Sequence, residues 1–369
     1  MEKQRICIVG DGLSGLTSAI ALNNLPNIEV HLISRKGHKK QDKRTTAISE
    51  SNFNFLIDNL KNLNNKMFWP SKNIELFYET DHKKINFLNL REDKSNLLYV
   101  FENDKIKNIL TKQIKKNKIK IFYKDIKNLN DLKDYELIIL CLGGTSEIYD
   151  NIAKGRSIKK DYKEIAITGY VKHNMKNLNT SQFFLKEGPL AILPFSKNNF
   201  SFVWSVNKDF YKFNSKKIMK LIKDKILDLL KPNKKIKINN IQSYPITLGL
   251  KSTYHDKNIL ILGEGLHTIH PVAGQGFNLV IRDIKKLKEI LNYYTRLGIS
   301  IKNSYALKNF CDQRKPENTI MGLGVDVTHN FFKKNKYLDP FKKIILENLD
   351  KNDAIKKISK IISNRGLSS

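Results

Sequence analysis

Two glycine-bearing segments of the chain have the residue types and spacing that nucleotide binding requires. The first is Gly10-Asp11-Gly12-Leu13-Ser14-Gly15, which follows a short apolar run and opens a longer one. In a strand–turn–helix context, Gly10 permits the tight turn, Gly12 lets the backbone approach a pyrophosphate, and Gly15 lets the helix pack on the strand. The N–H groups at the start of the helix favour phosphate oxygens. The segment therefore predicts a dinucleotide site.

The acidic residue expected after the second strand of such a unit is absent. Ser34 stands there, followed by Arg35. A carboxylate would accept charge-assisted hydrogen bonds from an adenosine ribose, whereas Ser34 offers only neutral ones. A Ser-Arg pair also suits the 2′-phosphate of NADP. An NADP-linked reductase therefore stays open as an alternative at this point.

The second segment runs from Gly263 to Leu279, with Arg282-Asp283 one turn further on. It leads from an apolar strand through a glycine-rich loop into a helix. The Pro271–Gly276 part can direct backbone N–H groups at a flavin ring edge, where negative charge gathers on reduction. His267 and His270 have a spacing that metal ligands can use, but no carboxylate or third ligand is patterned with them. We therefore expect a loop-capping or flavin-adjacent role for these histidines and no metal.

The elements that must position these segments alternate between strands and helices, except in the middle of the chain. Between Ile165 and Tyr244 the pattern becomes strands alone, and from Tyr305 onward it is mostly helical. The remaining expected elements are strands Ile6–Val9, Glu29–Ile33, Tyr135–Leu142, Phe183–Leu185, Leu190–Leu193, Phe200–Val206 and Ile259–Leu262, and helices Leu13–Leu25, Phe53–Leu63, 104–117 and one from about Phe277. Nucleotide-type elements thus bracket a β-rich insertion.

Composition limits the function classes. The net charge of +30 would suggest a nucleic-acid partner, but only nine of the 66 basic residues are Arg, the residue preferred for phosphate and base contacts. We therefore expect no nucleic acid, although the charge would assist peripheral association with anionic lipid. The three cysteines form no ligand pattern, no apolar run is long enough to cross a membrane, and the N-terminus leaves no room for a signal peptide. We expect a cytoplasmic protein, with the C-terminal Ile355–Ile362 helix either packed or interfacial.

At this point the chain resembles the ubiquinone-biosynthesis hydroxylases, which are FAD-dependent aromatic monooxygenases of the para-hydroxybenzoate hydroxylase type. The resemblance implies an α/β fold, with a Rossmann-like FAD-binding domain of the glutathione-reductase type, an inserted β-sheet substrate domain and a helical C-terminus. The corresponding ranges are 1–75, 99–164 and 246–300 for FAD, 76–98 and 165–245 for substrate, and 301–369 for the C-terminal region. The matching segments, in the family's order, are Gly10–Gly15, Arg44–Ser49, Tyr99–Asn103, Gly188–Pro194, Val203-Trp204, Tyr244-Pro245 and His267–Asp283.

The resemblance also implies roles for individual positions. Arg44 would reach the phosphates or shield the flavin, and Glu264, where the family usually has Asp, would bond the ribityl chain. Cys141–Gly144 stands where the family has a strand ending in Asp-Gly. The implied substrate pocket consists of Leu190, Ile192, Pro194, Trp204 and His270. The implied cofactor contacts are Gly10, Gly12, Leu13, Ser14, Gly15, Ser34, Arg35, Arg44, Gly263, Glu264, Pro271, Gly274, Gln275, Gly276, Phe277 and Asn278.

The activity implied is hydroxylation of an aromatic ring through a flavin hydroperoxide, with NAD(P)H or another reductant as electron donor. The substrate implied is a polyprenylated phenol of ubiquinone biosynthesis, with dioxygen as co-substrate, acted on at the inner membrane surface or within a biosynthetic complex. No acid or base is assigned. A degenerate member of the family with weakened FAD binding and a non-catalytic role is the remaining alternative.

Overall fold

The computed structural model of the chain describes residues 3–35, 41–60, 65–80, 83–144, 146–152, 155, 157–232, 236–302, 304–333, 339–349 and 351–366. Within these residues the strands form three sheets. The first is six-stranded, in the order β15-β16-β9-β1-β2-β8, and carries both nucleotide-type segments. Its strands are β1 (Gln4–Val9), β2 (Ile28–Ser34), β8 (Lys120–Tyr123), β9 (Leu137–Leu140), β15 (His255–Asp256) and β16 (Ile259–Ile261).

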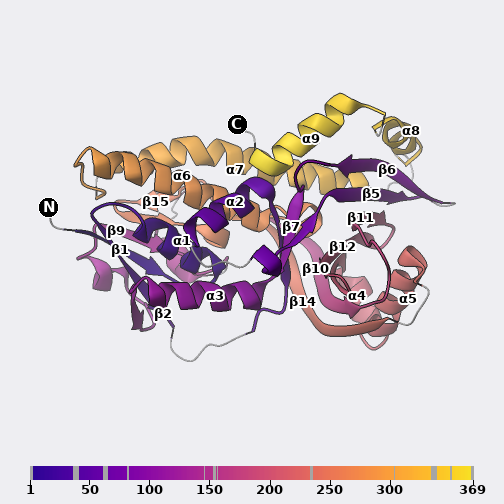
Figure 1. Cartoon of the computed structure of the whole chain (residues 1–369), viewed down its shortest axis with the longest axis horizontal. Helices are drawn as coiled ribbons and strands as arrows, with labels where there is room; N and C mark the ends of the chain where they lie inside the picture. The colour runs from indigo at the N-terminus through magenta and orange to yellow at the C-terminus, as the bar shows by residue number, and fades with distance from the viewer. Residues whose placement is uncertain are drawn as a thin grey trace.

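Strands β2, β1, β9 and β16 of this sheet run parallel, so their carboxyl ends meet at one edge. Their apolar runs are fully buried, as expected for a parallel sheet covered by helices. The α1 helix (Leu13–Asn23) packs against both α3 (Asn103–Lys116) and α6 (Gly276–Arg296), and α6 packs against α7 (Ser304–Phe332). Figure 1 shows this layered body at the N-terminal end of the molecule. It contains the largest hydrophobic core.

The second sheet is eight-stranded, in the order β17-β14-β10-β13-β12-β11-β5-β6. One of its faces packs on two helices, α4 (Lys208–Asn214) and α5 (Ile218–Leu230), around a second core (Figure 1). Its strands are β5 (Asn73–Glu79), β6 (Lys84–Arg91), β10 (Ile158–Lys172), β11 (Thr180–Leu185), β12 (Gly188–Ser196), β13 (Asn199–Asn207), β14 (Lys237–Leu250) and β17 (His267–Thr268).

A small third sheet connects the two bodies. It has the order β3-β7-β4, from β3 (Thr45–Ser49), β7 (Leu98–Glu102) and β4 (Trp69–Ser71). The hydroxyl of Thr45 in β3 hydrogen-bonds that of Ser201 in β13, which joins this sheet to the larger one. The α2 helix (Glu50–Asn59) follows β3 directly and contacts α6.

The two C-terminal helices pack against elements of both bodies. The α8 helix (Asp339–Leu349) and α9 (Asp353–Arg365) both contact β6, and α9 also contacts α2 and β3 (Figure 1). Asn364 of α9 accepts a hydrogen bond from the backbone N–H of Ser51 (2.9 Å), and Arg282 of α6 donates to the Ser363 carbonyl (3.1 Å). Among the helices that the structure describes, none is long and apolar enough to cross a membrane.

The α/β architecture with an inserted sheet and a helical C-terminus is as expected, but three details differ. The larger sheet extends beyond the expected substrate-domain ranges, because β5 begins at Asn73, β10 begins at Ile158, β14 ends at Leu250 and β17 lies at His267–Thr268. The stretch expected to be strands alone contains α4 and α5. The helix expected over Phe53–Leu63 spans Glu50–Asn59 instead, and residues 61–64 lie outside the described residues.

Candidate active site

The carboxyl ends of three adjacent parallel strands bring the two nucleotide-type segments together. Gly10 follows β1, the Cys141–Gly144 turn follows β9, and Gly263 follows β16. A Cβ built on Gly263, whose φ is +79°, would lie 2.9 Å from the Ser14 hydroxyl, so the two segments touch. Segments about 250 residues apart in sequence therefore form one continuous edge, where ligands of open α/β sheets bind.

The glycines of this edge fall into two groups. A Cβ on Gly10, whose φ is +118°, would overlap the Cys141 carbonyl, and one on Gly15 would overlap the Gly10 carbonyl. These two glycines are required by the packing of the protein itself. By contrast, a Cβ on Gly12, Gly143, Gly274 or Gly276 would meet no described atom within 4 Å. The second group borders open space near this edge of the sheet, which is called the crease below.

The chemistry around this crease fits FAD. The α1 helix begins next to Gly12 without a side-chain hydrogen bond at its N-cap, so its first N–H groups are available to phosphate. Across the crease, Pro271–Ala273 forms a 3₁₀ turn that ends at Gly274 with φ +60°. The Oε1 atom of Gln275 is buried without a hydrogen-bond partner among the described residues, as expected of a group that a ligand would satisfy.

Arg44 is held in one position beside this crease. Its guanidinium donates two hydrogen bonds to Asp42 (2.6 and 2.8 Å) and lies 4.9 Å above the ring centre of Tyr244. The hydrogen bond to Asp42 is the main cause that raises the pKa of Arg44 above its usual value, and the nearby Glu264 carboxylate adds to it. Arg44 thus feels the charge of the exposed Glu264, which is about 220 residues away in sequence.

Asn278 organises the loop rather than facing open space. Its Oδ1 accepts hydrogen bonds from the Ser49 backbone N–H (2.9 Å) and from Asn52 (2.7 Å), and its Nδ2 donates to the carbonyls of Ala47 and Gly274 (both 3.2 Å). All of its capacity is thus used within the protein. Asn278 fixes the glycine loop to β3 and α2.

Ser34 and Arg35 lie at the carboxyl end of β2, beside the first glycine turn. The Ser34 side chain is buried, and Arg35 makes an ion pair with Asp125 (3.1 Å) in which both side chains are at least half exposed. Their location suits an adenosine ribose, and their cofactor contacts stay a prediction. Leu13, Ser14 and Phe277 likewise lie at the starts of the two helices that flank the crease.

The predicted substrate pocket needs correction. Leu190, Ile192 and Trp204 are buried on the face of the larger sheet that packs against Ile222 and Ile226 of α5, and alternation places Pro194 on the same face. These side chains are core, because strand residues two apart share a face. The opposite face of the same strands carries half-buried Ala191, Leu193 and Val203, and it is this face that reaches the glycine loop through Ile269.

A cavity of about 460 Å³ opens beside the crease. It is lined by Gly144 and Glu264 from the first body and by Thr247, Gly249 and Lys251 from the end of β14, so both bodies contribute. Its volume lies within the usual range for small-molecule pockets.

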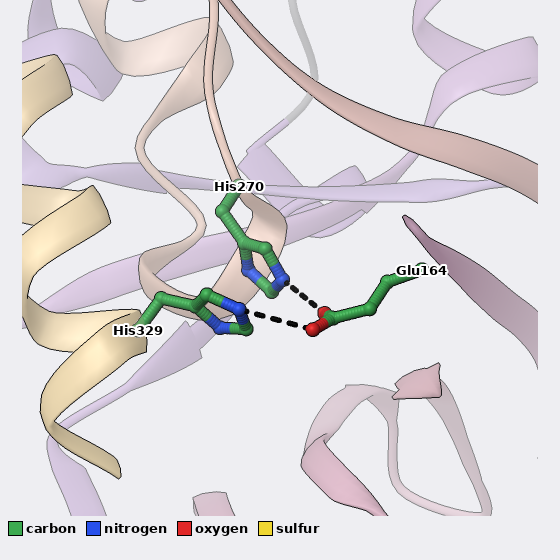
Figure 2. Close-up of side chains that lie close together, drawn as sticks. All are labelled: Glu164, His270 and His329. Carbon is green, nitrogen blue, oxygen red and sulfur yellow. Dashed lines mark hydrogen bonds and ion pairs between the residues drawn. The ribbon is translucent and has the colours of Figure 1, made fainter. Parts of the chain in front are cut away.

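His270, the last of the predicted pocket residues, is fully buried and forms a cluster with Glu164 of β10 and His329 of α7, shown in Figure 2. Neither partner was predicted from the sequence, in which they are 106 and 59 residues away from His270. His267 pairs with Asp283 (2.7 Å), which also accepts from Arg314 (2.7 Å). In the sequence, only the Arg282-Asp283 motif pointed to this network of His267, Asp283 and Arg314.

Comparison with known proteins agrees with this geometry. A family model described as FAD binding domain matches residues 147–296. The ubiquinone biosynthesis monooxygenase COQ6 of Dictyostelium discoideum is 24% identical over 418 residues, covering 89% of this chain and 84% of that protein. Ubiquinone hydroxylase UbiL of Rhodospirillum rubrum is 30% identical over 168 residues, covering 43% and 38%.

Among solved structures, p-nitrophenol 4-monooxygenase PnpA of Pseudomonas putida superimposes with a TM-score of 0.78 at 11% identity, covering 99% of this chain and 100% of that one. This likeness confirms the fold. The chain is thus similar over most of its length to a ubiquinone-biosynthesis monooxygenase, and it contains a match to an FAD binding domain.

Proposed function

We propose that this protein hydroxylates the aromatic ring of a polyprenylated phenol that serves as an intermediate of ubiquinone biosynthesis. The single observation that carries the proposal is the open space beside Gly12 and Gly274, next to which Val203 of the larger sheet packs with Ile269. The names of the relatives, one of which matches over 84% of its length, supply the substrate class.

Bound FAD would activate dioxygen, one atom of which enters the aromatic ring. The chain's own residues would bind the cofactor, orient the substrate and exclude water from the site. The start of α1 would hold the pyrophosphate, and Arg44, fixed by Asp42, would lie near its charge. Apolar Val203, Ala166 and Ile269 pack together beside the loop and would keep the reacting ring dry. NAD(P)H would visit transiently, because the sequence contains one nucleotide fingerprint.

A prenylated substrate implies work at a lipid surface, and the C-terminal helices have the required exposed residues. Ile344 and Ile345 of α8 and Ile358 and Ile361 of α9 are 41–61% exposed, although both helices contact β6. Exposed Lys357 lies next to Ile358. Apolar side chains next to Lys suit an interface with anionic lipid. We therefore propose that α8 and α9 form a peripheral membrane contact.

The enzymatic proposal is tested with FAD-loaded protein, NADH or NADPH, and a set of phenols with and without a prenyl tail. Expected are oxygen uptake and a product heavier by one oxygen atom, with prenylated phenols favoured. Oxygen uptake that yields only peroxide with every phenol would contradict the proposal.

The membrane contact is tested by flotation with phosphatidylcholine vesicles, with and without phosphatidylglycerol. Changing Ile358 and Ile361 together to Glu should lower binding to anionic vesicles several-fold. The matched control is Met219→Glu, because Met219 is equally exposed but lies on α5. Equal binding by all three proteins would remove α9 from the interface.

A further inference from the structure

The buried cluster of Glu164, His270 and His329 joins three separate parts of the molecule. Glu164 lies on β10 of the larger sheet, His270 precedes the glycine loop, and His329 lies on α7 (Figure 2). The Nε2 atoms of the two histidines lie 3.1 Å from opposite oxygens of the Glu164 carboxylate. The two rings stack with centres 4.0 Å apart. All three side chains are at most one-tenth exposed.

The hydrogen bonds fix the protonation state of His270. An ionised carboxylate only accepts, so the Nε2 atom of His270 carries a proton. The Nδ1 atom accepts a hydrogen bond from the backbone N–H of Val272 (3.1 Å), so it carries none. His270 is therefore the neutral Nε2–H tautomer, and its Nδ1 atom caps the 3₁₀ turn Pro271–Ala273 that leads to Gly274.

The surrounding charges favour the same state. Burial acts to raise the pKa of Glu164, but hydrogen bonds from His270 and His329, together with Lys333 at 3.2 Å, outweigh it and hold that pKa below its usual range. Burial lowers the pKa of His270 from its ordinary 6.5, with Glu164 opposing this and Lys333 adding to it.

Tyr162 of β10 completes the surroundings of the cluster. Its ring meets both imidazoles edge-on, at 5.0 and 4.9 Å, and the ion pair of Lys160 with Asp326 (2.7 Å) lies beyond it. Lys333, whose side chain is 47% exposed, makes an ion pair with the same carboxylate.

Two histidines and a carboxylate are also a common set of metal ligands, but this arrangement disfavours a cation. To bind metal through Nε2, His270 would need its proton on Nδ1, where the Val272 N–H already points. The ammonium of Lys333 already occupies the carboxylate.

We propose that Glu164 and His270 are positioning residues that hold the glycine loop in its cofactor-binding form, and that protonation of His270 at Nδ1 releases it. A proton on Nδ1 would face the Val272 N–H and remove the cap of the turn. FAD affinity should then fall as the pH falls. This inference rests on the proposed function, because the loop matters only if it faces FAD.

The test is FAD affinity from pH 7.5 down to the lowest pH at which the FAD-free protein stays folded, followed by quenching of flavin fluorescence. Wild-type Kd should rise as the pH falls, by up to about tenfold per unit once His270 titrates. In His270→Asn, the amide oxygen can replace Nδ1 as the cap acceptor and does not titrate. The Kd of FAD should therefore be higher than in the wild type at pH 7.5 and should not change with pH. His329→Gln is the control: it retains a donor for Glu164, and the pH dependence should remain. A flat wild-type profile, or one that disappears only in His329→Gln, would overturn the inference.

Two measurements without FAD separate this inference from the proposed function. The ¹⁵N shifts of the His270 ring in the FAD-free protein should report the Nε2–H tautomer at pH 7.5, whatever the enzyme does. A melting temperature that Zn²⁺ raises in the EDTA-treated wild type, but not in Glu164→Gln, would instead establish a metal site and overturn the proposal. If the tautomer is confirmed while FAD binds at no pH, the proposed function fails, and of the inference only the cap of the turn by His270 remains. If FAD binds but its Kd does not depend on pH, the inference fails and the proposed function stands.

Discussion

The two large sheets of this molecule approach the same crease in different ways. The six-stranded sheet presents the ends of its parallel strands, where Gly12, Gly143 and the Gly274 loop expose backbone. The eight-stranded sheet presents a face, where Ala191, Leu193 and Val203 expose side chains. A site edge made of backbone is damaged by adding atoms, whereas one made of side chains is damaged by removing them.

The largest expected effect is at the edge of the six-stranded sheet. In Gly15→Val, the new Cβ would overlap the Gly10 carbonyl, which is backbone and cannot turn away. We expect a loss of about 3 kcal/mol or more in the free energy of unfolding, measured by urea denaturation. Gly324→Ala on α7 is the matched control, because a Cβ there meets no described atom. Equal midpoints for the two variants would show that close packing at Gly15 is not required.

The next effect is on the buried face of the eight-stranded sheet. Leu190→Ala should cost about 3 kcal/mol of unfolding free energy, because Leu190 is fully buried in the core shared with α5. The Kd of FAD should not change. A Leu190→Ala protein that is as stable as the wild type but has an altered KM for the substrate would show that Leu190 lines the substrate pocket and not the core.

A smaller effect is expected on the opposite face of the same strand. Leu193→Ala removes a half-buried side chain on the side of the crease, so stability should fall by no more than about 1 kcal/mol. The KM for the aromatic substrate should rise several-fold in steady-state assays, with the Kd of FAD unchanged. A substrate KM that changes in Leu190→Ala but not in Leu193→Ala would show that the substrate contacts the face of Leu190 and not the face of Leu193.

The smallest effect is expected at the end of β2. Arg35→Ala breaks an exposed ion pair with Asp125 and should change both stability and the Kd of FAD by less than about 0.5 kcal/mol. Thermal shifts with FAD and with NADP distinguish the alternatives. An NADP shift in the wild type that Arg35→Ala abolishes would revive the NADP-linked reading of Ser34-Arg35.

The turns at the ends of the six-stranded sheet could be predicted from sequence, because the reasons why they require glycine lie within a few neighbouring residues. The Gly10–Gly15 spacing and the Pro271–Gly276 loop each predict a turn from local sequence alone. That the two turns lie close together was implied by the resemblance to the family, in which these motifs occur in the same order. The α5 helix also left a readable signal, since Ile218, Ile222 and Ile226 recur every four residues. That signal was overlooked among the strands around it.

The remaining parts could not be predicted because they depend on tertiary pairing. Alternation shows that Leu190 and Trp204 share a face, but not whether that face meets α5 or the crease. Glu164 and His329 approach His270 only after β10, the loop and α7 have packed, and neither has a sequence pattern of its own. Clusters assembled from three distant elements are visible only in the structure.

The most direct test of the account is whether the two glycine segments hold one ligand. Gly12→Leu and Gly276→Leu each place a side chain in space that is open without FAD, so the FAD-free proteins should melt close to the wild type. Each variant should bind FAD at least about 100-fold more weakly, a cost of roughly 3 kcal/mol, while Gly324→Ala binds normally. Wild-type FAD affinity in either leucine variant would contradict a cofactor that spans both segments.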